Sequence, residues 1–199
     1  MFYRPDAGHG LRFNPFKAIV APRPIGWIST RGADGDNLAP YSFFNAIADM
    51  PPQVMFASSG TKPDRDEGKD SLSHIAATGV FCVNIASAAL REAMNRSSAG
   101  LPAGTSEFGH AGVSAAECQT ISCPRVAGAP ASLECRMTRI MRLPGDANWL
   151  VLGMVTGVHL RDDCIRDGRF DLSADGWIAR LGYRDFAALH ETFEMERPE

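Results

Sequence analysis

Short apolar runs separated by turn residues recur along the chain and predict a series of strands. Residues 53–58 and 80–86 are apolar runs of strand length, bounded by a Pro-Pro pair and by glycines. Residues 18–29 are apolar and β-branched but interrupted by Pro22 and Pro24, so we expect part of this run to be an edge strand or an extended entry. Residues 32–37 read as a turn by composition.

Two longer runs in the second half of the chain indicate how the strands pack. Residues 133–143 alternate between two faces, with Cys135 on the apolar face and Glu134 on the polar one, as in a half-buried strand. Residues 149–160 are apolar on both faces, and Gly153 and Gly157 are placed where a strand covered on both sides would bend. Together these runs predict a mainly β protein built on a closed or nearly closed barrel.

Helices are fewer and are expected at the periphery of this barrel. Asp70 and Ser71 can cap a short helix that ends before Gly79, and a second helix is predicted over residues 88–96. Asp185 can cap a third helix near the C-terminus. Its apolar positions, three and four residues apart, are Phe186, Leu189 and Phe193. The stretch 97–130 is expected to meander without forming a second core.

Composition limits the number of domains and the kinds of partner. The 199 residues, 45% of them hydrophobic, suffice for one well-buried core, so we expect a single domain over residues 1–199. The formal net charge of -3, without a long block of one sign, argues against nucleic acid or a membrane surface as a partner. No apolar run reaches the roughly 20 residues that span a bilayer, and the first residues lack a secretory core. We therefore expect a cytoplasmic protein.

Several chemistries are disfavoured by the spacing of the residues they need. Five cysteines without a CxxC pair indicate free thiols rather than a disulfide framework or a structural zinc site. The five histidines lie far apart in sequence, so we expect surface or structural roles for them and no metal site. The chain has no Rossmann, P-loop or HExxH motif.

Small polar residues and one lysine stand where predicted strands end and a predicted helix begins. Backbone N–H groups, a hydroxyl and one positive charge are what a phosphate monoester needs. Taken one at a time, these segments are better explained as turns and caps, because Ser, Asn and Asp are the usual residues there. The residues are Ser29 and Thr30, Ser58 and Ser59, and Lys69, Asp70 and Ser71.

Four segments that span nearly the whole chain carry a more specific signal. They are residues 23–30 (RPIGWIST), 37–56 (NLAPYSFFNAIADMPPQVMF), 69–85 (KDSLSHIAATGVFCVNI) and 179–198 (ARLGYRDFAALHETFEMERP). In this order and spacing they resemble the flavin reductase-like family. The resemblance implies a Greek-key FMN-binding split β-barrel with a few peripheral helices. The chain has His74 and Ser71 where the family usually has Asn and Thr, and the second change keeps the hydroxyl.

The resemblance also implies the cofactor and the residues that bind it. FMN is expected in preference to FAD, with NADH or NADPH as the hydride donor. Hydride transfer between two stacked rings requires no dedicated acid or base, so we nominate no catalytic residue. Residues 69–71 would contact the phosphate, and the tail would approach the flavin or a partner subunit. The cofactor-binding residues implied are Ser29, Thr30, Asn37, Ala39, Pro40, Tyr41, Ser42, Ser58, Ser59, Lys69, Asp70, Ser71, Arg180 and Tyr183.

Three functions remain open on this evidence. The first is an NAD(P)H:FMN reductase, a homodimer that supplies reduced flavin to a flavin-dependent monooxygenase. The second is a flavoredoxin-like FMN electron carrier without direct NAD(P)H activity. The third is a flavin-free barrel kept as a dimeric binding or structural module, against which the phosphate-type residues argue. For Trp27, Phe43 and Phe44 we expect packing in the core rather than stacking on flavin.

Overall fold

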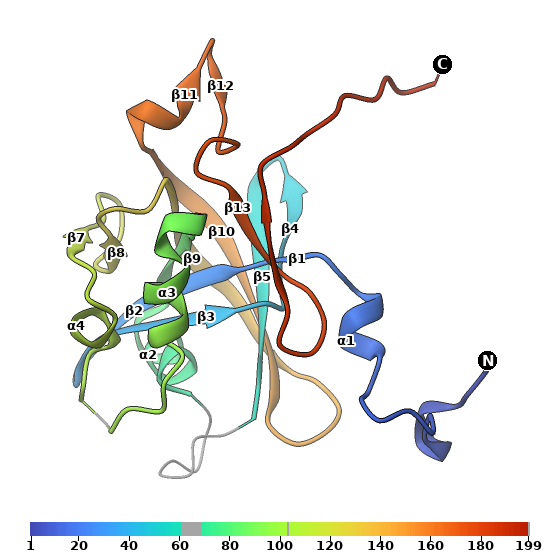
Figure 1. The fold of residues 1–199 in the computed structure, drawn as a ribbon. Helices are drawn as coiled ribbons and strands as arrows, with labels where there is room; N and C mark the ends of the chain where they lie inside the picture. Colours follow the sequence, from blue (N-terminus) through green and yellow to red (C-terminus); the bar gives the residue numbers. More distant parts are fainter. Residues whose placement is uncertain (61–68, 103, 199) are drawn as a thin grey trace.

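The main sheet of the protein has seven antiparallel strands in the order β3-β2-β6-β9-β10-β5-β4 (Figure 1). The computed structural model describes residues 1–60, 69–102 and 104–198. The strands predicted at 53–58, 80–86, 133–143 and 149–160 are confirmed. The seven strands are β2 Gly26–Gly32, β3 Gly35–Tyr41, β4 Phe44–Asp49, β5 Pro52–Ser59, β6 Val80–Ile85, β9 Ala131–Arg142 and β10 Asn148–Leu160.

The connection between β3 and β4 closes this sheet into a split barrel. These two strands lie at opposite edges of the sheet, yet only Ser42 and Phe43 separate them in the chain. Three residues of extended chain reach about 11 Å at most, so the sheet must curl until its two edges are close together. No ladder joins β3 to β4 in the described part of the chain. The edges therefore meet without pairing, which leaves one side of β3 open.

Smaller elements flank the barrel. Strands β1, β13 and β14 form a three-stranded sheet, and β7 with β8 and β11 with β12 form two-stranded hairpins. Their bounds are β1 Arg23–Pro24, β7 Ala115–Glu117, β8 Pro124–Val126, β11 Ile165–Arg166, β12 Arg169–Phe170, β13 Trp177–Arg180 and β14 Phe186–Leu189. The helices are α1 Phe16–Ile19, α2 Asp70–Thr78, α3 Arg91–Arg96 and α4 Glu107–Ala111, with 3-10 turns η1 Pro5–Ala7, η2 Ala88–Leu90 and η3 Asp162–Cys164. None of the described helices is long and apolar enough to cross a membrane.

Strand β2 is buried on both of its faces. Trp27 packs with Phe108 of α4 in an outer cluster, and its Nε1 donates to Ser97 Oγ at 2.8 Å. Ile28 points to the opposite face and packs with Phe44 inside the barrel. The prediction that Trp27 and Phe44 serve the core is confirmed, whereas Phe43 is only partly buried and lies outside the core clusters. Helices α3 and α4 cover the outer cluster.

Helix α2 ends where the sequence predicts but begins earlier than predicted. The helix ends at Gly79, whose φ of 73° is left-handed and whose N–H donates to Ile75 O at 2.8 Å. The N-cap is Lys69, with no side-chain cap hydrogen bond, so the prediction that Asp70 and Ser71 cap the helix is wrong. Both residues instead lie in the first helical turn. The predicted helix over 88–96 is confirmed as η2 followed by α3.

Two predictions near the N-terminus can be compared with the structure. The edge strand expected within residues 18–29 is confirmed as β1 Arg23–Pro24, which lies at the edge of the three-stranded sheet, and β2 follows from Gly26. The turn predicted over 32–37 is shorter, since β2 continues to Gly32 and β3 begins at Gly35. A strand hairpin with a two-residue turn satisfies more backbone groups here than a longer loop would.

The helix predicted from Asp185 is wrong. Residues Phe186–Leu189 form β14, which pairs with β13 so that Phe186 lies opposite Arg180. Phe193 lies in the segment 190–198, which contains no helix or strand. The apolar spacing suits a helix. In the structure, the ladder with β13 instead provides hydrogen-bond partners for the backbone N–H and C=O groups of residues 186–189.

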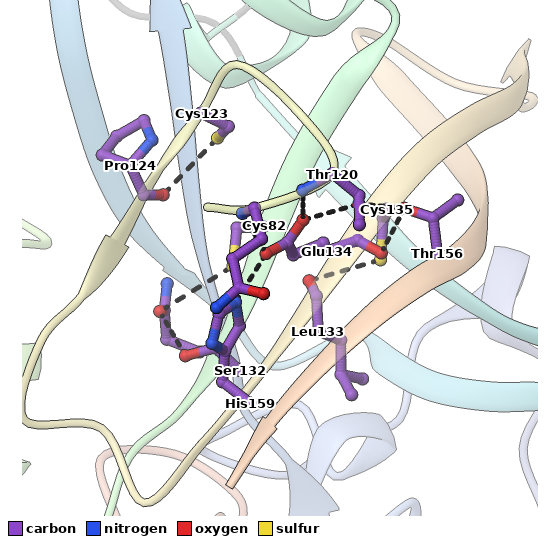
Figure 2. Close-up of polar contacts among 12 residues, drawn as sticks. Cys82, Thr120, Cys123, Pro124, Ser132, Leu133, Glu134, Cys135, Thr156 and His159 are labelled. Carbon is purple, nitrogen blue, oxygen red and sulfur yellow. Dashed lines mark hydrogen bonds and ion pairs between the residues drawn. The ribbon is translucent and has the colours of Figure 1, made fainter. Parts of the chain in front are cut away.

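Glu134 on β9 is the most consequential departure from the predicted pattern. The alternation places it on the polar face, yet it is 0% exposed because the loop between β7 and β8 covers it. Its carboxylate accepts the backbone N–H groups of Gln119 and Thr120 and the Thr120 hydroxyl, each at 2.6 Å, and lies 2.5 Å from His159 Nε2 (Figure 2). Burial acts to raise the pKa of Glu134, but these hydrogen bonds outweigh it and lower the pKa to about 2.

We predict that Glu134→Gln destabilises the fold. A pKa lowered from 4.5 to about 2 corresponds to about 3 kcal/mol of stability. Because the folded-state pKa is depressed, this stability is fully present above the ordinary carboxyl pKa and is lost as the pH falls toward 2. Urea unfolding at neutral pH should show the loss for Glu134→Gln, and the difference from wild type should shrink in acid. The exposed Glu92→Gln on α3 is the matched control, and equal losses in both variants would contradict this account.

Candidate functional site

A cavity of about 190 Å³ lies along the open edge of β3. Three parts of the chain complete its wall: the start of α2, the segment that follows α3, and the start of α4. The lining residues are Asn37, Ala39, Pro40 and Tyr41 from β3, Lys69, Asp70 and Ser71 at α2, Ser97, Ser98, Ala99 and Gly100 after α3, and Glu107 on α4.

The open edge of β3 is adapted to its lack of a neighbouring strand. Leu38 and Pro40 lie two residues apart, so their backbone groups point to the same side, away from β2. The Leu38 N–H donates to Glu107 Oε2 at 3.1 Å, and Pro40 has no N–H to leave unpaired. This edge therefore presents backbone carbonyls to the cavity.

Asn37 joins β3 to α2 and α4 across the floor of the cavity. Its side-chain amide lies 2.8 Å from Ser71 Oγ. With its oxygen toward Ser71, the amide accepts from that hydroxyl, and its nitrogen donates to Glu107 Oε2 at 3.2 Å. Both Asn37 and Ser71 are buried, so their polar groups are held in fixed positions.

His74 supports α2 from behind the cavity and does not line it. Its Nδ1 lies 3.1 Å from Thr30 Oγ1, and its Nε2 lies 2.7 Å from Asp34 Oδ1. A side chain on Gly32 would come within 2.3 Å of the His74 ring, so the ring fits only because position 32 is glycine. The residue that replaces the expected Asn thus attaches α2 to the β2–β3 hairpin.

Comparison with known proteins identifies the family. Residues 20–171 match the flavin reductase like domain. The chain belongs to the flavin reductase-like family. An uncharacterised protein of Deinococcus radiodurans is 38% identical over 197 residues, which cover 94% of this chain and 84% of that protein.

Two solved structures with the same fold have names that state a role, unlike the uncharacterised Deinococcus protein. Nitrilotriacetate monooxygenase component B from Bacillus cereus is 28% identical with a TM-score of 0.83, covering 94% of this chain and 100% of that one. Flavoredoxin of Desulfovibrio vulgaris shares the fold at 17% identity with a TM-score of 0.74, covering 88% of this chain and 91% of that one. The mainly β split barrel predicted from the sequence is thereby confirmed, and members of this family typically bind FMN.

The cavity of this flavin reductase-like chain offers polar groups suited to a flavin. The Lys69 ammonium lies 5.4 Å from the centre of the Tyr41 ring, so a positive charge stands beside the first turn of α2. Burial raises the pKa of Tyr41, whose hydroxyl stays protonated as a donor and faces Ser71 and Ser58. Within the described residues, the Tyr41 hydroxyl and Ser58 Oγ are buried without a hydrogen-bond partner.

The other residues implied by the resemblance lie away from this cavity. Ser29 is buried behind β3, where its Oγ donates to Pro124 O at 2.6 Å. Thr30 is likewise buried and holds His74. Arg180 donates to Tyr183 O in the turn between β13 and β14. The sequence-implied residues outside the lining of the single chain are Ser29, Thr30, Ser42, Ser58, Ser59, Arg180 and Tyr183.

Sequence reasoning missed part of the wall. The segment 97–100 (SSAG) and Glu107 both fall in the stretch that is expected only to meander, and neither is predicted to line a site. Glu107 is in fact 3% exposed and bonded to the edge of β3. The sequence signal that could have identified this part of the wall is the run of small residues at 97–100, because small side chains let the backbone approach a ligand closely.

Proposed function

We propose that this chain is an NAD(P)H-dependent FMN reductase that supplies reduced flavin to a partner oxygenase. The observation that carries the proposal is the meeting of Lys69, Ser71 and the N-terminus of α2 at one cavity beside the open edge of β3. The likeness to a monooxygenase component B at 28% identity supports the reductase role.

The flavin phosphate would bind at the start of α2. The first N–H groups of a helix have no acceptor within it, and the helix dipole favours an anion there. Lys69 would add one positive charge and Ser71 one hydroxyl. Asp70 and Glu107 also line the cavity, and as carboxylates they would accept hydrogen bonds from ribityl hydroxyls rather than approach the phosphate.

The ring system would lie along β3, where backbone groups and small side chains form the wall. Ala39 and Pro40 leave room for a flat ligand, and the edge carbonyls are acceptors for ring N–H groups. When bound, FMN supplies a hydride acceptor for a reduced nicotinamide. The chain itself would bind and orient the two rings and exclude water, so no side chain is assigned as acid or base.

A flavoredoxin-like electron carrier is the second candidate. The fold shared with a flavoredoxin and the lack of a dinucleotide motif in the sequence favour it. In that case the same cavity holds FMN, and electrons arrive from another protein. The two candidates differ only in whether a reduced nicotinamide reaches the flavin.

A second copy of the chain would complete the site. The cavity of about 190 Å³ is smaller than the roughly 300–1,000 Å³ of typical ligand pockets, so one chain encloses only part of a flavin. The N-terminal segment and the C-terminal tail extend away from the barrel (Figure 1). They expose large apolar side chains, among them Phe13, Phe16, Ile19, Phe193 and Met195. Terminal segments with exposed apolar side chains are suited to packing against a partner subunit.

The first prediction of this proposal concerns the phosphate. Lys69→Ala should weaken FMN binding by about 1.5–3 kcal/mol, roughly 10- to 150-fold in Kd, because a charge-assisted contact is lost. Riboflavin, which lacks the phosphate, should be affected far less. Flavin fluorescence titration measures both, and Arg169→Ala, an exposed cation on β12 outside the cavity lining, is the control. Equal losses for FMN and riboflavin would place the phosphate elsewhere.

The second prediction concerns activity. The purified protein should oxidise NADH or NADPH in the presence of FMN, and a chelator should leave the rate unchanged. No group of three or more His, Cys, Asp or Glu side chains in the described ranges is placed to hold a metal ion. Absorbance at the flavin's visible band follows the reaction without oxygen. A flavin that stays oxidised with both nucleotides but is reduced by dithionite would refute the reductase role and favour the electron carrier.

The third prediction concerns assembly. Light scattering of the flavin-bound protein should give about twice the 21.5 kDa of one chain. Phe186 and Leu189 are 41% and 42% exposed in the single chain, so we expect the partner to cover them. A monomer with flavin tightly bound would be inconsistent with a shared site.

A further inference from the structure

Three thiols that the proposed function does not use meet at the end of the β7–β8 hairpin. Glu117 and Pro124 form the last ladder pair of this hairpin. Cys118 and Cys123 are the next residues on each side, and the Cys118 N–H donates to Cys123 O at 3.1 Å. Cys82 of β6 packs in the same buried cluster (Figure 2). All five cysteines of the chain are free thiols in this structure.

Cys118 and Cys123 are within reach of a disulfide bond. Residues directly opposite each other in an antiparallel pair have Cβ atoms about 4.5–5.5 Å apart, and a disulfide needs about 3.5–4.5 Å. A shift of roughly 1 Å in the loop 119–122 would close this gap. Cys82 is less able to move, because it lies inside β6 between β2 and β9.

The three thiols differ in burial and in pKa, and therefore in reactivity. Cys82 and Cys123 are fully buried, whereas Cys118 is half-buried. The thiols of Cys123 and Cys82 donate to backbone carbonyls, Ser29 O at 3.3 Å and Val83 O at 3.9 Å. The presence of these two thiols lowers the pKa of Cys118, while the pKa values of Cys123 and Cys82 are raised. Cys118 is the most exposed of the three sulfurs and the thiolate is the nucleophilic form, so Cys118 is the reactive member. A surface cavity of about 490 Å³ beside residues 119–122 gives small molecules access to this loop.

We propose that Cys118 and Cys123 are a reversible oxidation site at which hydrogen peroxide converts the pair into a disulfide. The Cys118 thiolate attacks one peroxide oxygen, so an S–O bond forms, the O–O bond breaks, and hydroxide leaves and is protonated to water. The Cys123 sulfur then attacks Cys118, so the S–S bond forms, the S–O bond breaks, and a second water leaves with the Cys123 proton. Two thiols are oxidised and one peroxide is reduced. This site does not depend on the proposed flavin chemistry.

The bond would join the two limbs of the loop that holds Glu134. Gln119 and Thr120, whose N–H groups donate to that carboxylate, lie between the two cysteines. Cys123 Sγ also lies 3.3 Å from Ser29 O on β2. The oxidation site is therefore built against the barrel wall rather than on a free loop.

Trypsin cleavage places Cys118 and Cys123 on one peptide and each of the other three cysteines on a separate peptide. Cys118 and Cys123 share the peptide 97–125, Cys82 lies in 70–91, Cys135 in 126–136 and Cys164 in 162–166. The full chain is treated with hydrogen peroxide, unfolded with N-ethylmaleimide present, digested and weighed by mass spectrometry. We expect peptide 97–125 to become two hydrogen atoms lighter and to carry no label, while the other cysteines are labelled. Dithiothreitol should restore both labels on 97–125.

Variants test the order of the steps. Cys123→Ser should accumulate a sulfenic acid on Cys118 that dimedone traps, and Cys118→Ser should leave Cys123 fully labelled after peroxide. Cys164→Ser, remote in sequence from the pair, should form the bond as wild type does. A cross-link of 70–91 to 97–125 as the main product, or unchanged thiols at peroxide levels that oxidise free cysteine, would overturn the proposal. The wild-type measurement decides it even if a variant fails to fold.

Discussion

The two-residue connection between β3 and β4 is the constraint on which the rest of this structure depends. Ser42 and Phe43 hold the joined ends of the two outermost strands within about 11 Å of each other, so the seven-stranded sheet has to curl around its apolar face. The same connection leaves β3 and β4 unpaired with one another. Closure therefore creates the core and, at the split, an open strand edge where a ligand can contact the backbone.

Strand β2 connects this open edge to the opposite wall of the barrel. Ser29 and Thr30 are neighbours on β2 whose side chains point to opposite faces. Ser29 bonds to Pro124 at the loop end of the β7–β8 hairpin, and Thr30 bonds to His74 of α2. The loop that carries Gln119 and Thr120 is anchored in turn by the buried Glu134 carboxylate. The helix of the candidate phosphate site and the thiol cluster are thus fastened to the same strand from its two sides.

The sequence was most informative where local pattern and tertiary structure agree. Short apolar runs predicted β5 and β6, alternation predicted β9, and a run that is apolar on both faces predicted β10. Gly153 and Gly157 coincide with shifts in the β9–β10 register. The pattern failed at Phe186, where pairing with β13 prevailed over helical spacing. It also failed at Glu134, because the partners that make burial of a carboxylate tolerable come from a segment distant in sequence, and it gave no sign of the buried Glu107 for the same reason. The position of Lys69 and Ser71 at the start of α2 could be predicted; the wall that faces them could not.

A crystal structure of the purified protein with FMN tests the central claim most directly. The account predicts one flavin per chain, with its phosphate at the first turn of α2 against Lys69 and Ser71 and its ring along the open edge of β3. Flavin bound elsewhere, such as the groove between α3 and β14, would contradict the assignment of the site. An empty cavity at saturating FMN, in crystals whose packing leaves that cavity open, would contradict flavin binding by this chain.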